Sequence, residues 1–168
     1  MSTVQGKHNI SLYVENKPGV TIRIALVFAR RGYNIESFVG SPAQDPRYSR
    51  INIEATGDSR TLHLMLEQLN RLVDVIHARE YSEEDVIQKE LALIKVRCNN
   101  NSRTEILQIS NAFKCRNVDI SDSTMTFQVT GRSTKIDAVR KMLDKFGILE
   151  VVRTGKVLIA RGEEETSW

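Results

Sequence analysis

The chain of 168 residues has little cysteine and no long apolar run. Its two cysteines, Cys98 and Cys115, do not form a disulfide framework, and because both have apolar neighbours we expect buried, reduced thiols. Apolar stretches such as residues 24–29 are too short to cross a bilayer. Residues 1–10 have no apolar core of a secretory signal. We therefore expect a cytoplasmic protein without a membrane segment.

Catalytic patterns are also missing. The three histidines, His8, His63 and His77, are scattered, and none lies one helical turn from another or beside a cysteine, as a zinc site would require. The sequence contains no G-x-S-x-G, no P-loop and no G-x-G-x-x-G. Most carboxylates fall on the polar faces of expected helices and strands. We expect no catalytic site and no metal or cofactor bound by this chain.

What the sequence does contain is a regular alternation of strand and helix patterns. Apolar residues at every second position predict strands, and apolar stripes with a 3.6-residue period predict helices. In the first half the strands are expected over residues 10–14, 33–40, 51–55 and 73–76, and the helices over residues 19–31 and 59–72. The resulting order, βαββαβ, is that of a split ferredoxin-like unit.

The same order recurs after a polar, acidic segment at residues 82–88, which is expected to be a linker. Strands are expected over residues 91–96, 118–120, 125–129, 148–152 and 157–160, and helices over residues 102–113 and 133–143. The fold class is therefore α+β, with two tandem ferredoxin-like βαββαβ domains at residues 1–81 and 89–168. The acidic end of the second domain is expected to be frayed, with Trp168 disordered.

Each predicted domain is small, so its hydrophobic core is thin. Helices cover only one face of a ferredoxin-like sheet, which leaves the other face or an edge strand to be covered by another element. Pairing with a second copy of the chain is a common solution. We therefore expect at least a homodimer.

Binding to nucleic acid is the first function that this fold class suggests, because RRM domains share the βαββαβ order. Such domains stack bases on aromatic side chains of the central strands, where this chain offers Phe38 and Phe127. Phe127 shares its strand face with Met125 and Val129, which indicates a core position. With a net charge of only +3 and no basic arm, we expect no nucleic-acid partner.

A more specific feature is the joint between the first strand and the first helix, Asn16-Lys17-Pro18-Gly19. Pro18 near the first helical turn lacks an N–H that would be unpaired there. Gly19 has no side chain to cover the backbone N–H groups at the positive end of the helix dipole, so an anion can approach them closely. The carboxylate of a free amino acid fits this requirement. Asn16 offers both a donor and an acceptor to such a ligand.

Asn34 lies beyond the other end of the same helix, roughly 20 Å from Gly19. It cannot complete the pocket within one chain, but a two-fold dimer with antiparallel first helices would bring Asn34 of one protomer to Gly19 of its mate. A purely structural interpretation stays open: Pro18-Gly19 as a turn, Asn16 as a helix cap and Asn34 as a residue tolerated after the helix end.

These residues belong to segments that resemble those of a known protein family. ENKPGVTIRIALVFARRGYNIES at residues 15–37, SRINIEATGD at 49–58, KELALIKVR at 89–97 and EVVRTGKVLIARG at 150–162 resemble the small regulatory subunit of acetolactate synthase, also called acetohydroxyacid synthase. The resemblance runs from about residue 8 to residue 162, in the family's order. It implies that the first domain is an ACT domain, an amino-acid-binding module that dimerises.

The resemblance also implies a function and a site. The chain would have no catalysis of its own, and would activate a large catalytic subunit that carries thiamine diphosphate, Mg²⁺ and FAD. It would confer feedback inhibition by a branched-chain amino acid, typically valine, bound between two ACT domains. The family's effector pattern matches Asn16, Gly19 and Asn34, and Val20 and Ile35 would line the apolar part of the pocket. The alternative is a free-standing ACT-type sensor that regulates another enzyme or a repressor.

Overall fold

The computed structural model describes residues 5–166, and the chain divides into two units. The first unit contains Met1–Ile87 together with Lys156–Trp168, and the second contains Gln88–Gly155. The second unit is thus inserted into the sequence of the first. The expected division into residues 1–81, 82–88 and 89–168 differs from this one in keeping the C-terminal segment with the second domain.

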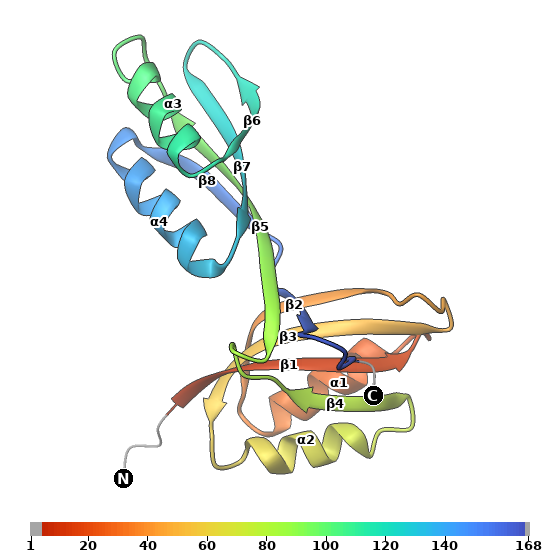
Figure 1. Ribbon diagram of the computed structural model, residues 1–168. Coiled ribbons are helices and arrows are strands. Elements are labelled where there is room, and N and C mark those ends of the chain that lie inside the picture. The colour runs from red at the N-terminus through yellow and green to blue at the C-terminus, as the bar shows by residue number, and fades with distance from the viewer. Residues whose placement is uncertain (1–4, 167–168) are drawn as a thin grey trace. The chain divides into compact units, whose positions relative to one another are not determined.

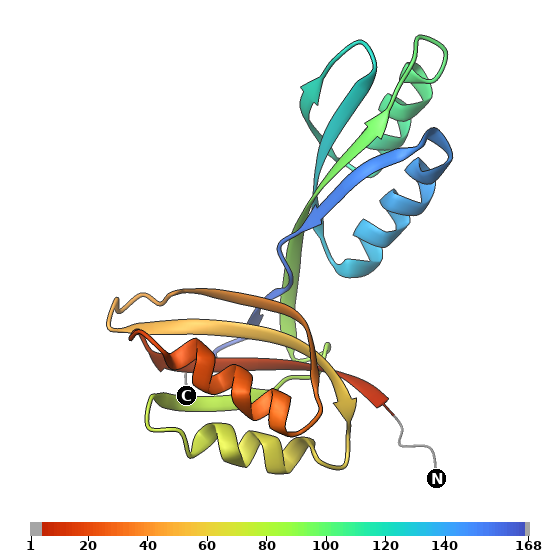
Figure 2. The same ribbon diagram turned by 180° about the vertical axis from the view of Figure 1, so that it is seen from behind.

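The first unit has the expected βαββαβ order. Its elements are β1 (Gln5–Glu15), α1 (Val20–Arg30), β2 (Asn34–Pro42), β3 (Tyr48–Asp58), α2 (Leu62–Asn70) and β4 (Val75–Glu80). The sheet has the order β2-β3-β1-β4, and its neighbouring strands pair antiparallel. Both helices lie on the same face of this sheet, as the two opposite views in Figures 1 and 2 show.

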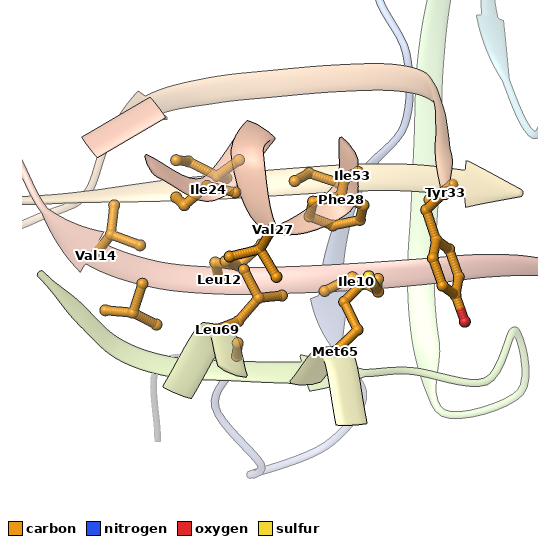
Figure 3. Close-up of a cluster of buried hydrophobic side chains, with 14 of the residues drawn as sticks. Ile10, Leu12, Val14, Ile24, Val27, Phe28, Tyr33, Ile53, Met65 and Leu69 are labelled. Atoms are coloured by element: carbon orange, nitrogen blue, oxygen red, sulfur yellow. The ribbon is translucent and has the colours of Figure 1, made fainter. Parts of the chain in front are cut away.

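The core of the first unit lies between that sheet face and the two helices. Alternate residues of β1 are fully buried there, as the period-two pattern predicts. Figure 3 shows how the side chains from the strands and from both helices meet in one layer. The cluster includes Ile10, Leu12, Val14, Ile24, Val27, Phe28, Ile53, Met65 and Leu69. Burial of this layer fixes the faces of α1 and α2 and so the positions of the loops at their ends.

One edge of the first sheet is formed by β2, which pairs only with β3 among the described residues. Most of its side chains are exposed or half-buried. An edge strand of this kind presents unpaired backbone groups to which another chain can add. A second copy of the chain can pair at this edge, and the homodimer stays a prediction.

The second unit repeats the same order of elements. They are β5 (Val86–Arg97), α3 (Arg103–Ala112), β6 (Arg116–Ile120), β7 (Thr124–Gly131), α4 (Ser133–Leu143), a 3₁₀ turn at Asp144–Phe146 and β8 (Ile148–Arg153). Its sheet has the order β6-β7-β5-β8. Phe127 is buried with Met125 and Val129 in the core of this unit, which confirms the core position expected for it.

The C-terminal segment corrects two expectations. β9 (Val157–Ala160) pairs with β5, and Leu158 packs against Tyr81 and Val86. The expected linker, residues 82–88, therefore ends early, since β5 already begins at Val86. The acidic end is not frayed, because Thr166 is only 2% exposed. The prediction for Trp168 lies outside the described residues.

The closing strand of the first unit also differs from the expectation. It covers Val75–Glu80 rather than residues 73–76, and Val73 is exposed. The Asn70 side chain explains the shift, because its Oδ1 accepts from the Ala78 amide at 2.8 Å and its Nδ2 donates to the Ala78 carbonyl at 2.9 Å. These bonds tie the end of α2 to the middle of β4, a contact that hydrophobic patterning does not show.

Candidate functional site

The joint between β1 and α1 is a turn that ends in a left-handed glycine. α1 begins at Val20, so Pro18 lies two residues before the helix, near its first turn as expected. Gly19 has φ +86°, which side-chain-bearing residues rarely adopt. A Cβ atom at this position would also lie 3.2 Å from Nη1 of Arg23. Glycine is therefore required by the backbone conformation, whereas the Arg23 side chain is flexible and can move aside.

The first turn of α1 contains unpaired backbone N–H groups. No side chain caps the helix. The Val20 amide reaches the Lys17 carbonyl at 3.5 Å, and the Arg23 amide donates to the Gly19 carbonyl at 3.2 Å. The amides of Thr21 and Ile22 have no acceptor within the described part of the chain. Unpaired N–H groups at the positive end of a helix dipole favour an anion such as a carboxylate.

Arg23 adds a charged group to this corner, and sequence reasoning missed it. Its Nη2 lies 2.6 Å from Oδ2 of Asp74, which is mostly buried. Arg23 follows Gly19 by four residues, so the helical period alone places the two on the same side. Asp74 is distant in sequence and gave no such signal. The corner thus contains a cation and a carboxylate, the two charges that complement a free amino acid.

Asn16 borders the same corner. Its Nδ2 donates to the Pro46 carbonyl at 3.0 Å, which uses one of its two N–H groups and leaves Oδ1 available as an acceptor. Next to it the Glu15 carboxylate accepts a hydrogen bond from Lys17, which raises the pKa of the Lys17 ammonium above its usual value. This ion pair is solvent-exposed and contributes little to stability.

The remaining predicted site residues lie elsewhere. Asn34 is the first residue of β2, beyond the far end of α1, where its Nδ2 donates to Glu36 Oε1 at 2.7 Å. Ile35 is half-buried against the core, and Val20 is buried within it, so in one protomer the Val20 side chain is not open to a ligand. Within one chain the structure brings Asn16 and Gly19 together and keeps Asn34 and Ile35 apart from them.

Other reactive groups do not gather into a site. Within residues 5–166, no three His, Cys, Asp or Glu side chains are close enough to hold a metal ion. His8 is buried and its Nδ1 lies 2.8 Å from Glu80 Oε1. Burial raises the pKa of the Cys115 thiol. In the same described part, no helix has the length and apolar character needed to span a bilayer.

The first unit, with its β2-β3-β1-β4 sheet and both helices on one face, has the architecture of the ACT class of domains. Comparison with known families agrees: residues 10–77 match the family described as the AHAS small subunit-like ACT domain. Residues 89–162 match the family described as the small subunit of acetolactate synthase. The chain therefore belongs to the acetolactate synthase small subunit family, whose members are regulatory subunits.

Individual relatives cover nearly the whole chain. A protein of Methanothermobacter thermautotrophicus named "Probable acetolactate synthase small subunit" is 44% identical over 92% of this chain and 93% of its own length. The acetolactate synthase small subunit of Mycobacterium bovis is 37% identical over 92% of each chain. The crystal structure of the Thermotoga maritima small subunit superposes with a TM-score of 0.85, at 33% identity, over 95% of this chain and 99% of that one. This match confirms the predicted α+β fold of two ferredoxin-like domains.

Proposed function

We propose that this chain activates a large catalytic subunit of acetolactate synthase and makes it sensitive to feedback inhibition by a branched-chain amino acid, valine first. The single observation that carries the ligand part is the uncapped first turn of α1 beside Gly19. The partner is proposed to carry thiamine diphosphate, Mg²⁺ and FAD, and to join pyruvate to a second 2-keto acid. This chain contributes regulation and no reacting group.

The open joint supplies what the polar part of an amino acid needs. The amides of Thr21 and Ile22 and the Arg23 guanidinium face a carboxylate favourably. Oδ1 of Asn16 and the Asp74 carboxylate provide acceptors for the ammonium group. Charged groups of both signs at one corner favour a zwitterion over a simple anion, which supports a free amino acid as the ligand.

A second copy of the chain supplies the rest of the pocket in this proposal. The β2 edge is open, and α1 exposes two large apolar side chains, Ile22 at 67% and Leu26 at 46%. If two-fold symmetry sets the first helices antiparallel, Asn34 and Ile35 of one protomer approach Gly19 of its mate. Ile35 then lines the apolar part of the pocket. The affinity for the ligand then depends on the arrangement of the dimer.

Inhibition follows from linkage between effector and dimer arrangement. An effector can regulate only if it binds one arrangement more tightly than another. A coupling free energy of about 1–3 kcal/mol shifts the activity of the partner between several-fold and a hundredfold. In this proposal valine stabilises the arrangement that activates the large subunit less.

Reconstitution with the large subunit tests this function. In Gly19→Asp the new carboxylate repels the carboxylate of the effector, so activation is expected to remain while valine inhibition is lost. Gly147→Asp is the matched control, because Gly147 has nearly the same φ, +87°, in the second unit. It is expected to keep both activation and inhibition. Unchanged valine inhibition in Gly19→Asp would refute the site, and lack of activation by the unaltered chain would favour a free-standing sensor.

A further inference from the structure

The last described residues, 156–166, form a strap on the first sheet, on the face opposite α1 and α2 (Figures 1 and 2). Lys156 Nζ donates to Glu54 Oε1 at 3.0 Å on β3. Further along, Arg79 Nη1 of β4 lies 2.7 Å from Glu164 Oε1, and Arg50 Nη1 of β3 donates to Thr166 Oγ1. We call residues 156–166 the C-terminal strap.

The two halves of the strap are held differently. Its first half is anchored, because Leu158 and Ala160 are buried and the Arg161 amide donates to the Asp85 carbonyl at 3.0 Å. The acidic half is held by side-chain contacts, among them the half-exposed Glu164–Arg79 ion pair and the Arg50 bond to Thr166, which is 2% exposed. The ion pair by itself contributes little to stability. A competing segment that offers the same contacts to Arg50 and Arg79 can therefore displace the acidic half while the anchored half stays.

The surface beneath the strap has the composition of a protein-binding surface. Tyr13 and Tyr48 stack with ring centroids 5.1 Å apart, and Arg50 lies over the Tyr13 ring at 6.0 Å. Arg79 lies over the Tyr81 ring at 5.1 Å. Tyrosine and arginine are the residue types enriched where binding energy concentrates in interfaces. Guanidinium groups on this face favour a partner with carboxylates.

Two buried polar atoms on the same face are not used by the strap. Asn52 follows Arg50 by two residues on β3, so it shares the outer face, and it is only 8% exposed. Tyr81 is 5% exposed and packs against Leu158 of the strap. Asn52 Oδ1 has no partner within the described residues, and the Tyr81 hydroxyl has the Arg79 guanidinium near it. Buried polar atoms usually have hydrogen-bond partners, so this face retains capacity for a ligand.

We propose that this outer face binds an extended acidic segment of another chain, and that residues 163–166 occupy it in cis as an intramolecular competitor. Carboxylates of the incoming segment pair with Arg50 and Arg79, and its backbone amides supply a donor to Asn52 Oδ1. The partner is the large catalytic subunit, an assignment that rests on the proposed function. Because a tethered competitor acts at high effective concentration, the acidic end of the strap sets the affinity for that partner.

A labelled peptide tests the competition on the full-length chain. The probe is fluorescein-tagged RGEEETSW, the sequence of residues 161–168, and its binding is followed by anisotropy. Glu164→Arg places a like charge beside Arg79 and releases the acidic end, whereas Glu163→Arg changes the charge equally at an exposed residue with no ion pair among the described residues. The peptide is expected to bind Glu164→Arg about fivefold or more tightly than Glu163→Arg. Equal binding would overturn the competition.

Two further measurements identify the surface and the partner. Arg79→Gln added to Glu164→Arg is expected to weaken peptide binding several-fold, and unchanged binding would overturn the surface. Addition of the large subunit is expected to displace the peptide, and no displacement would overturn the large subunit as the partner. The test of the valine site is independent of this one, because Gly19→Asp is expected to leave peptide binding unchanged. Failure here and failure of the proposed effector site are therefore separable.

Discussion

The two units share one order of elements but build their first strand–helix joint in different ways. In the second unit, Asn99 Oδ1 accepts hydrogen bonds from the Asn101 and Ser102 amides at 3.0 and 2.9 Å. Ser102 Oγ in turn accepts one from the Asn99 amide at 3.0 Å. In the first unit Gly19 holds the turn in a left-handed conformation, and neither α1 nor α3 has a side-chain cap.

This difference shows how one fold can be used in two ways. Hydrogen bonds from short polar side chains close the turn before α3, and Glu105 in the first turn of that helix places a carboxylate at the positive end of its dipole. A left-handed glycine makes the turn before α1 instead, and the first turn of α1 contains no acidic residue to oppose the dipole. The second joint is thus a structural element, and the first has the properties of a binding site.

The largest expected effect tests whether the two units are independently stable. Ile24 and Ile106 are both fully buried, one in the core of each unit. Ile24→Ala and Ile106→Ala are each expected to lower the free energy of unfolding by about 2–5 kcal/mol, because each leaves a cavity. Hydrogen exchange should locate the loss of protection in β1 for the first and in β7 for the second. Equal loss in both units from either change would show a single cooperative structure.

A smaller loss of stability is expected on substitution of Gly57, near the end of β3, and almost none on substitution of Gly131, at the end of β7. A Cβ on Gly57 would lie 2.3 Å from the Tyr33 ring, which is buried and donates a hydrogen bond to the Asp58 carbonyl. Gly57→Ala is therefore expected to cost about 1–3 kcal/mol. At Gly131 the nearest atom is Cδ of Lys135, at 2.7 Å, on a flexible side chain.

Gly131→Ala is the control for that change, and we expect it to alter the free energy of unfolding by less than about 0.5 kcal/mol. Urea denaturation of the two variants provides the comparison. If both lose the same stability, the rigid contact with Tyr33 is not what requires Gly57.

The turn residues give the next effect. Asn99→Ala removes the acceptor for the Asn101 and Ser102 amides in the turn before α3 and is expected to cost about 1 kcal/mol. Asn16→Ala removes only an exposed bond to the Pro46 carbonyl and is expected to stay within about 0.5 kcal/mol. Valine affinity, measured by calorimetry, should fall for Asn16→Ala and remain for Asn99→Ala. The reverse pattern would assign the ligand to the second joint.

The smallest effect concerns pH. Burial raises the pKa of Tyr81 above its ordinary value of 10.0. Because the protonated phenol is favoured in the folded state, its contribution to stability is complete below the unfolded pKa and is lost as the pH rises through the folded one. The ultraviolet titration difference between the unaltered chain and Tyr81→Phe should show a midpoint above 10.0. A midpoint at or below that value would contradict burial beneath the strap.

Local patterns predicted much of this molecule. Alternation in β1 and β7 and the apolar stripes of the helices follow from burial on one face, which the sequence records residue by residue. The Asn16 and Gly19 joint was found in the same way, as a turn before an apolar helix. The Arg23–Asp74 ion pair and the Asn70 bonds to β4 join residues that the periodicity does not relate, so no pattern indicated them.

The amino-acid sequence alone determined the two βαββαβ repeats, the family likeness and the glycine that opens the first helix. Those features depend on local propensity and on periods of two and 3.6 residues. Only the tertiary structure decided that residues 156–166 return to the first unit, because the strand pattern at 157–160 does not say which unit it joins and the acidic run at 163–165 resembles a free end. Arg50 and Arg79 hold Thr166 and Glu164 there, and these contacts join residues more than 80 positions apart, a distance that no local pattern spans.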